Sequence, residues 1–250
     1  MTVIQLASPL QRAWLTALVV LWACFLFGGF LFGKTDRKSN RRMPTWTRMA
    51  SSMILVVASW SWFIFTRTSP VAALSLLIAI GMTLGFIGDL FLARVFPLSQ
   101  PTFGGIAFFG LGHISYILAM VQFGNQSCLD TPAPRWGALC LWLLIGLCGW
   151  CFIVYRGNEL TTLHIAALAY TLLLSSTAGL ATGLALQSTA FIPMAIGAGL
   201  FLLSDLILAA QLFNDIQFPL IGDVVWLTYG PAQMLIVFAV NGALMVVSHY

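Results

Sequence analysis

The sequence predicts an all-α integral membrane protein, a polytopic bundle of eight transmembrane helices. Hydrophobic residues make up 60% of the 250 residues and charged residues only 7%, against about 25% charged in an ordinary soluble domain. The apolar residues fall into long runs near the ~20 residues that a bilayer-spanning helix needs. We therefore interpret residues 1–250 as a single integral membrane domain, in which any active site must be built between helices.

Eight runs meet this length criterion, and short polar segments separate them. The first run is about as long as the others and lacks the basic start and small-residue cleavage site of a secretory signal. It is therefore expected to remain in the protein as a helix. The predicted spans are 13–32, 49–65, 71–92, 103–123, 136–155, 162–186, 190–213 and 224–247.

Basic residues crowd the loop after the first span, which the positive-inside rule therefore places in the cytoplasm. Alternation of sides then puts Arg94 and Arg156 inside and both termini outside. We interpret the cluster as a topology determinant that also contacts anionic lipid headgroups, and nucleic-acid binding is not expected. The inner membrane is the expected location in a bacterial host and the endoplasmic reticulum in a eukaryotic one. The cluster consists of Lys34, Arg37, Lys38, Arg41, Arg42 and Arg48.

Two aspartates lie deep within apolar runs, Asp89 in the third predicted span and Asp205 in the seventh. Each opens a similar pentad, Asp-Leu-Phe-Leu-Ala and Asp-Leu-Ile-Leu-Ala. An ionised Asp at the centre of a membrane helix costs about 2.5–3.5 kcal/mol on insertion scales, so such residues usually face a cavity and mark a functional site. Both spans cross in the same direction, which suggests two parallel four-helix halves.

Other polar residues share the depth of the two acids, towards the predicted cytoplasmic end. His113 and Tyr116 are three residues apart on the fourth span, and Tyr229 and Gln233 are four apart on the eighth. Residues at these spacings share one face of a helix. The sequence therefore predicts a polar pocket that opens to the cytoplasmic leaflet.

Small and charged residues flank the acids. Gly81 and Gly85 precede Asp89 at steps of four, a spacing that lets a neighbouring helix approach the acid-bearing face. Ser204 stands directly before Asp205. Arg94 follows Asp89 and is interpreted either as a snorkelling anchor or as a contact for a lipid phosphate. Asp223 is expected to be the N-cap of the last helix.

Two carboxylates in a low-dielectric site repel each other and are each penalised for ionising, so at least one is expected to hold its proton near neutrality. One aspartate can then act as an acid and the other as a base, which suits hydrolysis through an oxocarbenium-like cation. A purely structural role and coupled transport are the alternatives. A metal is not expected, because the histidines are only His113, His164 and His249, and zinc needs three or more suitably placed ligands.

Four short motifs resemble those of the YhhN-like lysoplasmalogenase family. The resemblance covers roughly residues 50–240 and excludes the first span and its basic loop. The motifs are Gly88-Asp89 with the following Leu-x-Leu, Gly112-His113-Ile-Ser-Tyr116, Ser204-Asp205-Leu-Ile-Leu-Ala209, and Tyr229 with Ala232-Gln233-x-Leu-Ile236.

This resemblance implies an eight-helix membrane hydrolase that cleaves the vinyl ether bond of lysoplasmalogens. Asp89 and Asp205 would be the catalytic acid and base, in either order, without a cofactor. His113, Tyr116, Tyr229, Gln233 and Ser204 would orient them or the substrate, and Arg94 or Arg156 would meet the phosphate if it is not simply a snorkelling anchor. The expected partners are the lysophospholipid substrate and membrane lipids. Another ether or ester lysolipid is compatible with the same residues, and a proton-coupled carrier that uses both acids is the rival function.

Overall fold

Helices form every predicted span in the computed structural model of the protein, which describes residues 8–35, 40–96, 100–157 and 159–248. Eight helical segments are long and apolar enough to cross a membrane, and the described residues contain no β-strand. The predicted fold class is therefore confirmed. Arg37, Lys38 and His249 lie outside the described residues.

The helices extend a few residues beyond several of the predicted spans. Proline is the first residue of three of them, a position that suits its fixed φ and missing N–H. The helices are α1 (Pro9–Phe32), α2 (Thr45–Thr66), α3 (Ala72–Leu92), α4 (Pro101–Gln126), α5 (Pro132–Gly149), α6 (Thr162–Gln187), α7 (Ile192–Asn214), α8 (Ile221–Val237) and α9 (Ala239–Val247), with a π-helical turn η1 (Trp150–Tyr155) after α5 and a 3₁₀ turn η2 (Thr189–Phe191) before α7.

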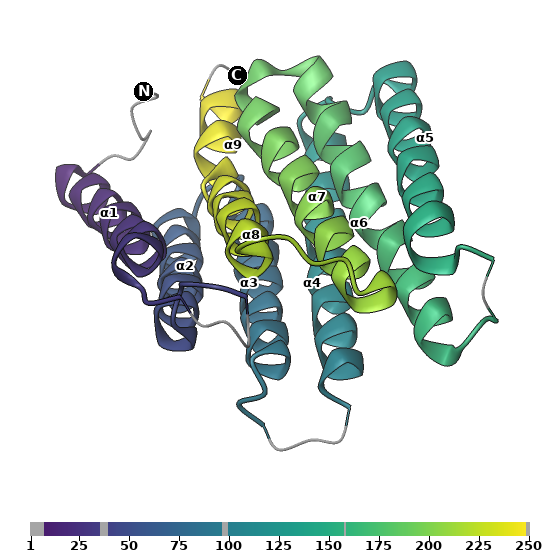
Figure 1. Ribbon diagram of the computed structural model, residues 1–250. Coiled ribbons are helices and arrows are strands. Elements are labelled where there is room, and N and C mark those ends of the chain that lie inside the picture. Colours follow the sequence, from purple (N-terminus) through teal and green to yellow (C-terminus); the bar gives the residue numbers. More distant parts are fainter. Residues whose placement is uncertain (1–7, 36–39, 97–99, 158, 249–250) are drawn as a thin grey trace.

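Six helices form a closed ring, in which α2, α3, α4, α6, α7 and α8 each pack on the next and α8 packs back on α2. The α1 helix lies outside this ring against α2 and α8, and α5 lies outside it against α6. These two helices form opposite edges of the bundle (Figure 1) and are its least buried spans. The interior of the ring is thus the place where side chains from distant segments meet.

The order of packing is the same in the two halves of the chain. The series α2, α3, α4 in the first half corresponds to α6, α7, α8 in the second, and the contacts of α4 with α6 and of α8 with α2 join the halves. This is the arrangement that two parallel four-helix halves predict. It places α3 and α7, the helices that carry the aspartates, at equivalent positions in the ring.

Glycines let α4 and α8 approach the acid-bearing face of α3. A Cβ atom at Gly81 would lie 2.4 Å from Cε1 of Tyr116, and one at Gly85 would lie 3.0 Å from Nε2 of Gln233. Small residues at helix interfaces allow such close approach in membranes. The predicted role of these glycines therefore agrees with the packing, which brings α4 and α8 side chains against α3.

Asp223 holds the loop between α1 and α2 against α8. Its buried carboxylate accepts the backbone N–H groups of Arg42 at 2.5 Å and Met43 at 2.9 Å. The prediction that Asp223 is an N-cap is wrong, because Leu220 occupies that position and Asp223 lies in the first turn of the helix. A buried carboxylate requires hydrogen-bond donors, and here the loop supplies them.

Candidate active site

Asp89 lies one turn before the end of α3 and is buried inside the ring. Its Oδ2 atom accepts a hydrogen bond from Ser52 Oγ of α2 at 2.6 Å and another from Tyr229 OH of α8 at 3.1 Å. Charge-assisted bonds of this kind are stronger than neutral ones. Hydroxyls from two neighbouring helices thus fix the orientation of the carboxylate.

A chain of hydrogen bonds continues behind Asp89. Nε2 of Gln233 donates to the Tyr229 hydroxyl at 2.8 Å, and the Tyr116 hydroxyl donates to Oε1 of Gln233 at 3.2 Å. All three side chains are buried. Each group donates towards the next, so the chain runs from Tyr116 on α4 through α8 to the carboxylate on α3 and ends at an acceptor.

Asp205 occupies the corresponding position on α7. The Tyr170 hydroxyl of α6 donates to its Oδ2 atom, and Ser204 Oγ donates to its Oδ1 atom at 3.3 Å. Asp205 is only partly buried, whereas Asp89 is buried. In both halves, therefore, a hydroxyl from the second helix of the half donates to the aspartate on the third.

His113 is buried in the core between α4 and α6. Its Nδ1 atom lies 3.0 Å from Oγ1 of Thr177, and its ring centroid lies 4.6 Å from that of Phe201. Its Nε2 atom has no hydrogen-bond partner among the described residues. The histidine contacts the ring of Tyr116, so it lies beside the polar chain, although no hydrogen bond joins it to either aspartate in the described part of the protein.

Both aspartates line one cavity of about 190 Å³, which we call the acid cavity. It lies between α2, α3, α7 and α8 at the end of the bundle where the loop after α1 crosses. Of the predicted site residues, Asp89, Asp205 and Tyr229 reach it. The other lining residues are Arg41, Arg48, Leu92, Ala93, Phe109, Leu208, Gln211, Gly222, Val225 and Trp226.

A second cavity of about 240 Å³, which we call the apolar cavity, adjoins the first between α4, α6 and α7. Leu92, Phe109, Asp205 and Leu208 line both. Asp205 therefore stands at the junction of a polar and an apolar space, whereas Asp89 faces the polar space alone. The remaining residues of the apolar cavity are Arg94, Pro101, Thr102, Ile106, Val154, Ala167, Tyr170, Thr171, Leu174, Leu202, Leu206, Ala209, Leu212 and Phe213.

The predicted site residues differ in whether they line the acid cavity, the apolar cavity or neither cavity. Tyr229 lies at the acid cavity, and exposed Arg94 lies at the apolar cavity, just beyond α3. Tyr116, Gln233, His113 and Ser204 line neither cavity. Ser204 and the Tyr116–Gln233 pair still reach the acids, the first directly and the second through Tyr229.

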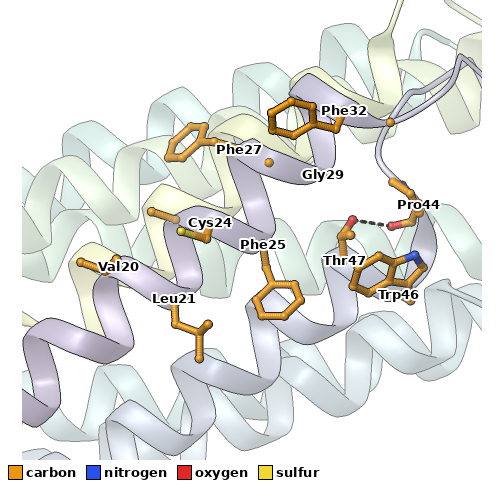
Figure 2. Close-up of a pocket in the computed structure, with 13 residues that line it drawn as sticks. Val20, Leu21, Cys24, Phe25, Phe27, Gly29, Phe32, Pro44, Trp46 and Thr47 are labelled. Carbon is orange, nitrogen blue, oxygen red and sulfur yellow. Dashed lines mark hydrogen bonds between the residues drawn. The ribbon is translucent and has the colours of Figure 1, made fainter.

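A hollow larger than either cavity lies elsewhere, on the outer side of α1 (Figure 2). This groove of about 880 Å³ runs along α1 to the start of α2, and Figure 2 shows Leu21, Phe25, Phe27 and Trp46 along it. It contains no acid or histidine. Its apolar lining suits contact with lipid, so the smaller acid cavity is the candidate active site.

Sequence reasoning missed four residues of this site. Ser52 and Tyr170 donate to the acids, Phe109 lines both cavities, and Arg48 lines the acid cavity. Arg48 was placed in the basic loop, whereas it lies in the first turn of α2 and is only 6% exposed. The signal for Ser52 and Tyr170 was the repeat, because each precedes its aspartate by a similar length of chain.

Residues 43–240 match the model of the YhhN family. The chain belongs to the YhhN family. This is the lysoplasmalogenase-like family, and membership supports a membrane lysoplasmalogenase-type function at family level. Searches of curated proteins and of solved structures found no match.

The matched YhhN region contains both aspartates and, among the described residues, every one that donates a hydrogen bond to them. It leaves out α1 and most of the loop that follows it, as the motif resemblance predicted. The recognised family region thus contains the complete six-helix ring.

Proposed function

We propose that the protein is a membrane hydrolase that cleaves the vinyl ether bond of lysoplasmalogens. The products are a fatty aldehyde and glycerophosphocholine or glycerophosphoethanolamine. The observation that carries this proposal is that Asp89 and Asp205 line one cavity that adjoins an apolar one. In a substrate with a polar head, a reactive ether and one hydrocarbon chain, the head would lie in the acid cavity, the ether beside the aspartates and the chain in the apolar cavity.

The chemistry needs an acid and a base in turn. A protonated aspartate delivers its proton to the β-carbon of the vinyl ether, which leaves an oxocarbenium ion at the α-carbon. Water attacks this carbon while the second aspartate takes a proton from it, which gives a hemiacetal. The second aspartate then protonates the departing glycerol oxygen and the first takes the hemiacetal hydroxyl proton, so both return to their starting states.

Position favours Asp205 as the acid and Asp89 as the base. The β-carbon of the vinyl ether lies one bond further along the hydrocarbon chain than the α-carbon, which bears the ether oxygen, and Asp205 is the aspartate that lines both cavities. The α-carbon, which water attacks and which bears the ether oxygen, would then lie on the side of the acid cavity, beside Asp89. Each carboxylate accepts two hydroxyl hydrogen bonds, so the assignment of acid and base rests on the position of Asp205 at both cavities.

The supporting residues position the acids. Tyr170 and Ser204 orient Asp205, and Tyr116 and Gln233 act through Tyr229 on Asp89. Apolar side chains such as Ile106, Leu174 and Leu202 would hold the alkenyl chain. A hydrocarbon chain that enters from the bilayer is already out of water, so this cavity would position the chain rather than supply most of the binding energy.

Aldehyde release by purified protein in detergent tests the proposal, because no ion gradient exists there. Wild type is expected to release aldehyde from an alkenyl lysophospholipid. Asp89→Asn and Asp205→Asn are each expected to lower kcat by about 10²- to 10⁴-fold, the usual contribution of general acid–base catalysis. Asp215→Asn is the matched control, because Asp215 is exposed and lies just past the end of α7.

Activity that survives in both aspartate variants, with folding verified by size-exclusion chromatography, would contradict the dyad. If wild type releases no aldehyde but takes up a solute with protons in liposomes, the protein is a carrier instead. A carrier site is expected near the bilayer midplane, whereas the acid cavity lies towards one end of the bundle, beside the loop after α1.

A further inference from the structure

We propose that Arg48 and Arg41 form an anion subsite in the acid cavity that binds the phosphodiester of the lysophospholipid headgroup. This inference rests on the proposed function and names the part of the substrate that sets its position. The geometry points to it because both arginines line the cavity that holds the two aspartates. Arg94, by contrast, lines the apolar cavity, where the chain would lie.

Arg48 is a buried arginine with unused hydrogen-bonding capacity. Its side chain is 6% exposed, and among the described residues its buried Nε atom has no hydrogen-bond partner. The charges of Asp89 and Asp223 act on it, but the described residues form no salt bridge with it. Buried charges are normally paired or fully hydrogen-bonded, because desolvation is costly. The arginine also lies in the first turn of α2, where the helix dipole disfavours a cation. An anion in the cavity would pair with the buried charge of Arg48 and would offset its unfavourable interaction with the helix dipole.

Two contacts preorganise the guanidinium groups. Thr45 Oγ1 accepts a hydrogen bond from Nη2 of Arg48 at 3.1 Å and from Nη2 of Arg41 at 3.4 Å, so one hydroxyl holds both arginines. The Arg48 guanidinium also lies over the Trp226 ring, with Cζ 5.1 Å from the ring centroid. A planar guanidinium held in this way suits bidentate recognition of phosphate oxygens.

The charge of the cavity complements one phosphodiester. Arg41 and Arg48 supply two positive charges, and the proposed chemistry keeps one aspartate protonated and the other ionised. The residues that line the cavity therefore carry one net positive charge, which the single negative charge of a phosphodiester would neutralise, although the nearby Asp223 carboxylate also acts on Arg48 and offsets part of it. Three carbons of glycerol separate the ether oxygen from the phosphate ester oxygen, so a phosphate held at Arg48 would fix the ether beside the aspartates.

The test compares two substrates of the full-length protein in detergent, an alkenyl lysophospholipid and the corresponding alkenyl glycerol without phosphate. Arg48→Gln is expected to lower kcat/KM for the phospholipid by about 10- to 100-fold, mainly through KM, as for loss of a hydrogen bond to a charged group. The neutral substrate should be affected by less than about threefold on the same scale. Arg67→Gln, at the exposed far end of α2, is the matched control.

Further variants separate recognition from folding. Arg48→Lys should retain part of the preference for the phospholipid, because it keeps the charge and loses only the fork geometry. Arg41→Gln should also lower kcat/KM for the phospholipid more than for the neutral substrate. An equal loss for both substrates in Arg48→Gln would overturn the inference, since it would mean that Arg48 acts on the aspartates or on the fold. A selective loss in Arg94→Gln alone would overturn it as well.

A binding measurement keeps this inference separate from the proposed function. A saturated alkyl ether lysophospholipid, which lacks the vinyl bond, should bind wild type and bind Arg48→Gln about 10- to 100-fold more weakly, even if no aldehyde is ever released. Equal dissociation constants would overturn the anion subsite. Glycerophosphocholine should compete with the lipid, and competition by inorganic phosphate that is equally strong would assign the subsite to free phosphate rather than to a headgroup.

Discussion

The Tyr229 hydroxyl donates to Oδ2 of Asp89 at 3.1 Å and joins α8 to the end of α3 that carries the acid. The two residues are far apart in the sequence, and their contact exists only because the ring closes between α8, α2 and α3. It makes Tyr229 the one residue that both lines the acid cavity and belongs to the hydrogen-bond chain behind Asp89.

Tyr229→Phe should therefore lower kcat for aldehyde release. The variant removes a donor to the proposed base and leaves the Gln233 amide without its acceptor, while the ring keeps its packing. Loss of a hydrogen bond to a charged group corresponds to about a 10- to 100-fold effect. Steady-state kinetics check this. Tyr155→Phe is the control, because that ring stacks on Trp150 and lies outside both cavities. An unchanged kcat in folded Tyr229→Phe would remove Tyr229 from the mechanism.

Tyr170→Phe should also lower kcat by about 10- to 100-fold, because Asp205 loses the donor that orients it. If Asp205 is the acid, Tyr170→Phe and Tyr229→Phe should also differ in their solvent deuterium isotope effects. Proton delivery to carbon becomes slower relative to the other steps, so the solvent deuterium isotope effect on kcat is expected to rise in Tyr170→Phe. It should not rise in Tyr229→Phe. The opposite pattern would exchange the roles of Asp205 and Asp89.

Asp223→Ala should destabilise the protein without changing its chemistry directly. The Arg42 and Met43 N–H groups lose their acceptor, and a buried donor left unpaired costs about 1–3 kcal/mol. Thermal unfolding in detergent should show a lower midpoint, and trypsin should cut the loop faster. Asp215→Ala, at an exposed position, is expected to leave both unchanged. Equal protease resistance of the two variants would show that Asp223 does not hold the loop.

Gly81→Ala should weaken the contact between α3 and α4. Its Cβ would lie 2.4 Å from Cε1 of Tyr116, and overpacking of this kind typically costs about 1–3 kcal/mol. A displaced Tyr116 would also lose its bond to Gln233. The free energy of unfolding and the aldehyde-release rate should fall together. Gly137→Ala is the control, since a Cβ there meets nothing within 4 Å, and a comparable loss in both variants would rule out the steric explanation.

The spans were predictable because each apolar run must cross the bilayer by itself. Backbone groups in lipid have to be satisfied within the segment, which leaves the helix as the only local solution. Predicted limits were off by a few residues where prolines such as Pro101 and Pro132 begin the helix before the apolar run. The N-cap prediction for Asp223 was wrong for a different reason, because the groups that its carboxylate binds lie in a distant loop.

Asp89 and Asp205 stood out from the sequence because a carboxylate in an apolar run is costly. The residues that contact them did not. Ser52 and Tyr170 are ordinary in membrane helices, and only the packing of α2 on α3 and of α6 on α7 brings them to the acids. Arg48 belongs to a basic cluster that the positive-inside rule explains by itself, so the sequence offered no separate reason to place it at the cavity.

The sequence alone determined the eight spans, the family and the two costly aspartates, since each depends on local composition or on short motifs. The tertiary structure alone decided that the aspartates share one cavity, that Tyr116 and Gln233 act from behind Tyr229, and that Arg48 faces the acids. The physical reason is that a helix fixes which residues share its own face, whereas the partner that this face meets depends on how distant helices pack.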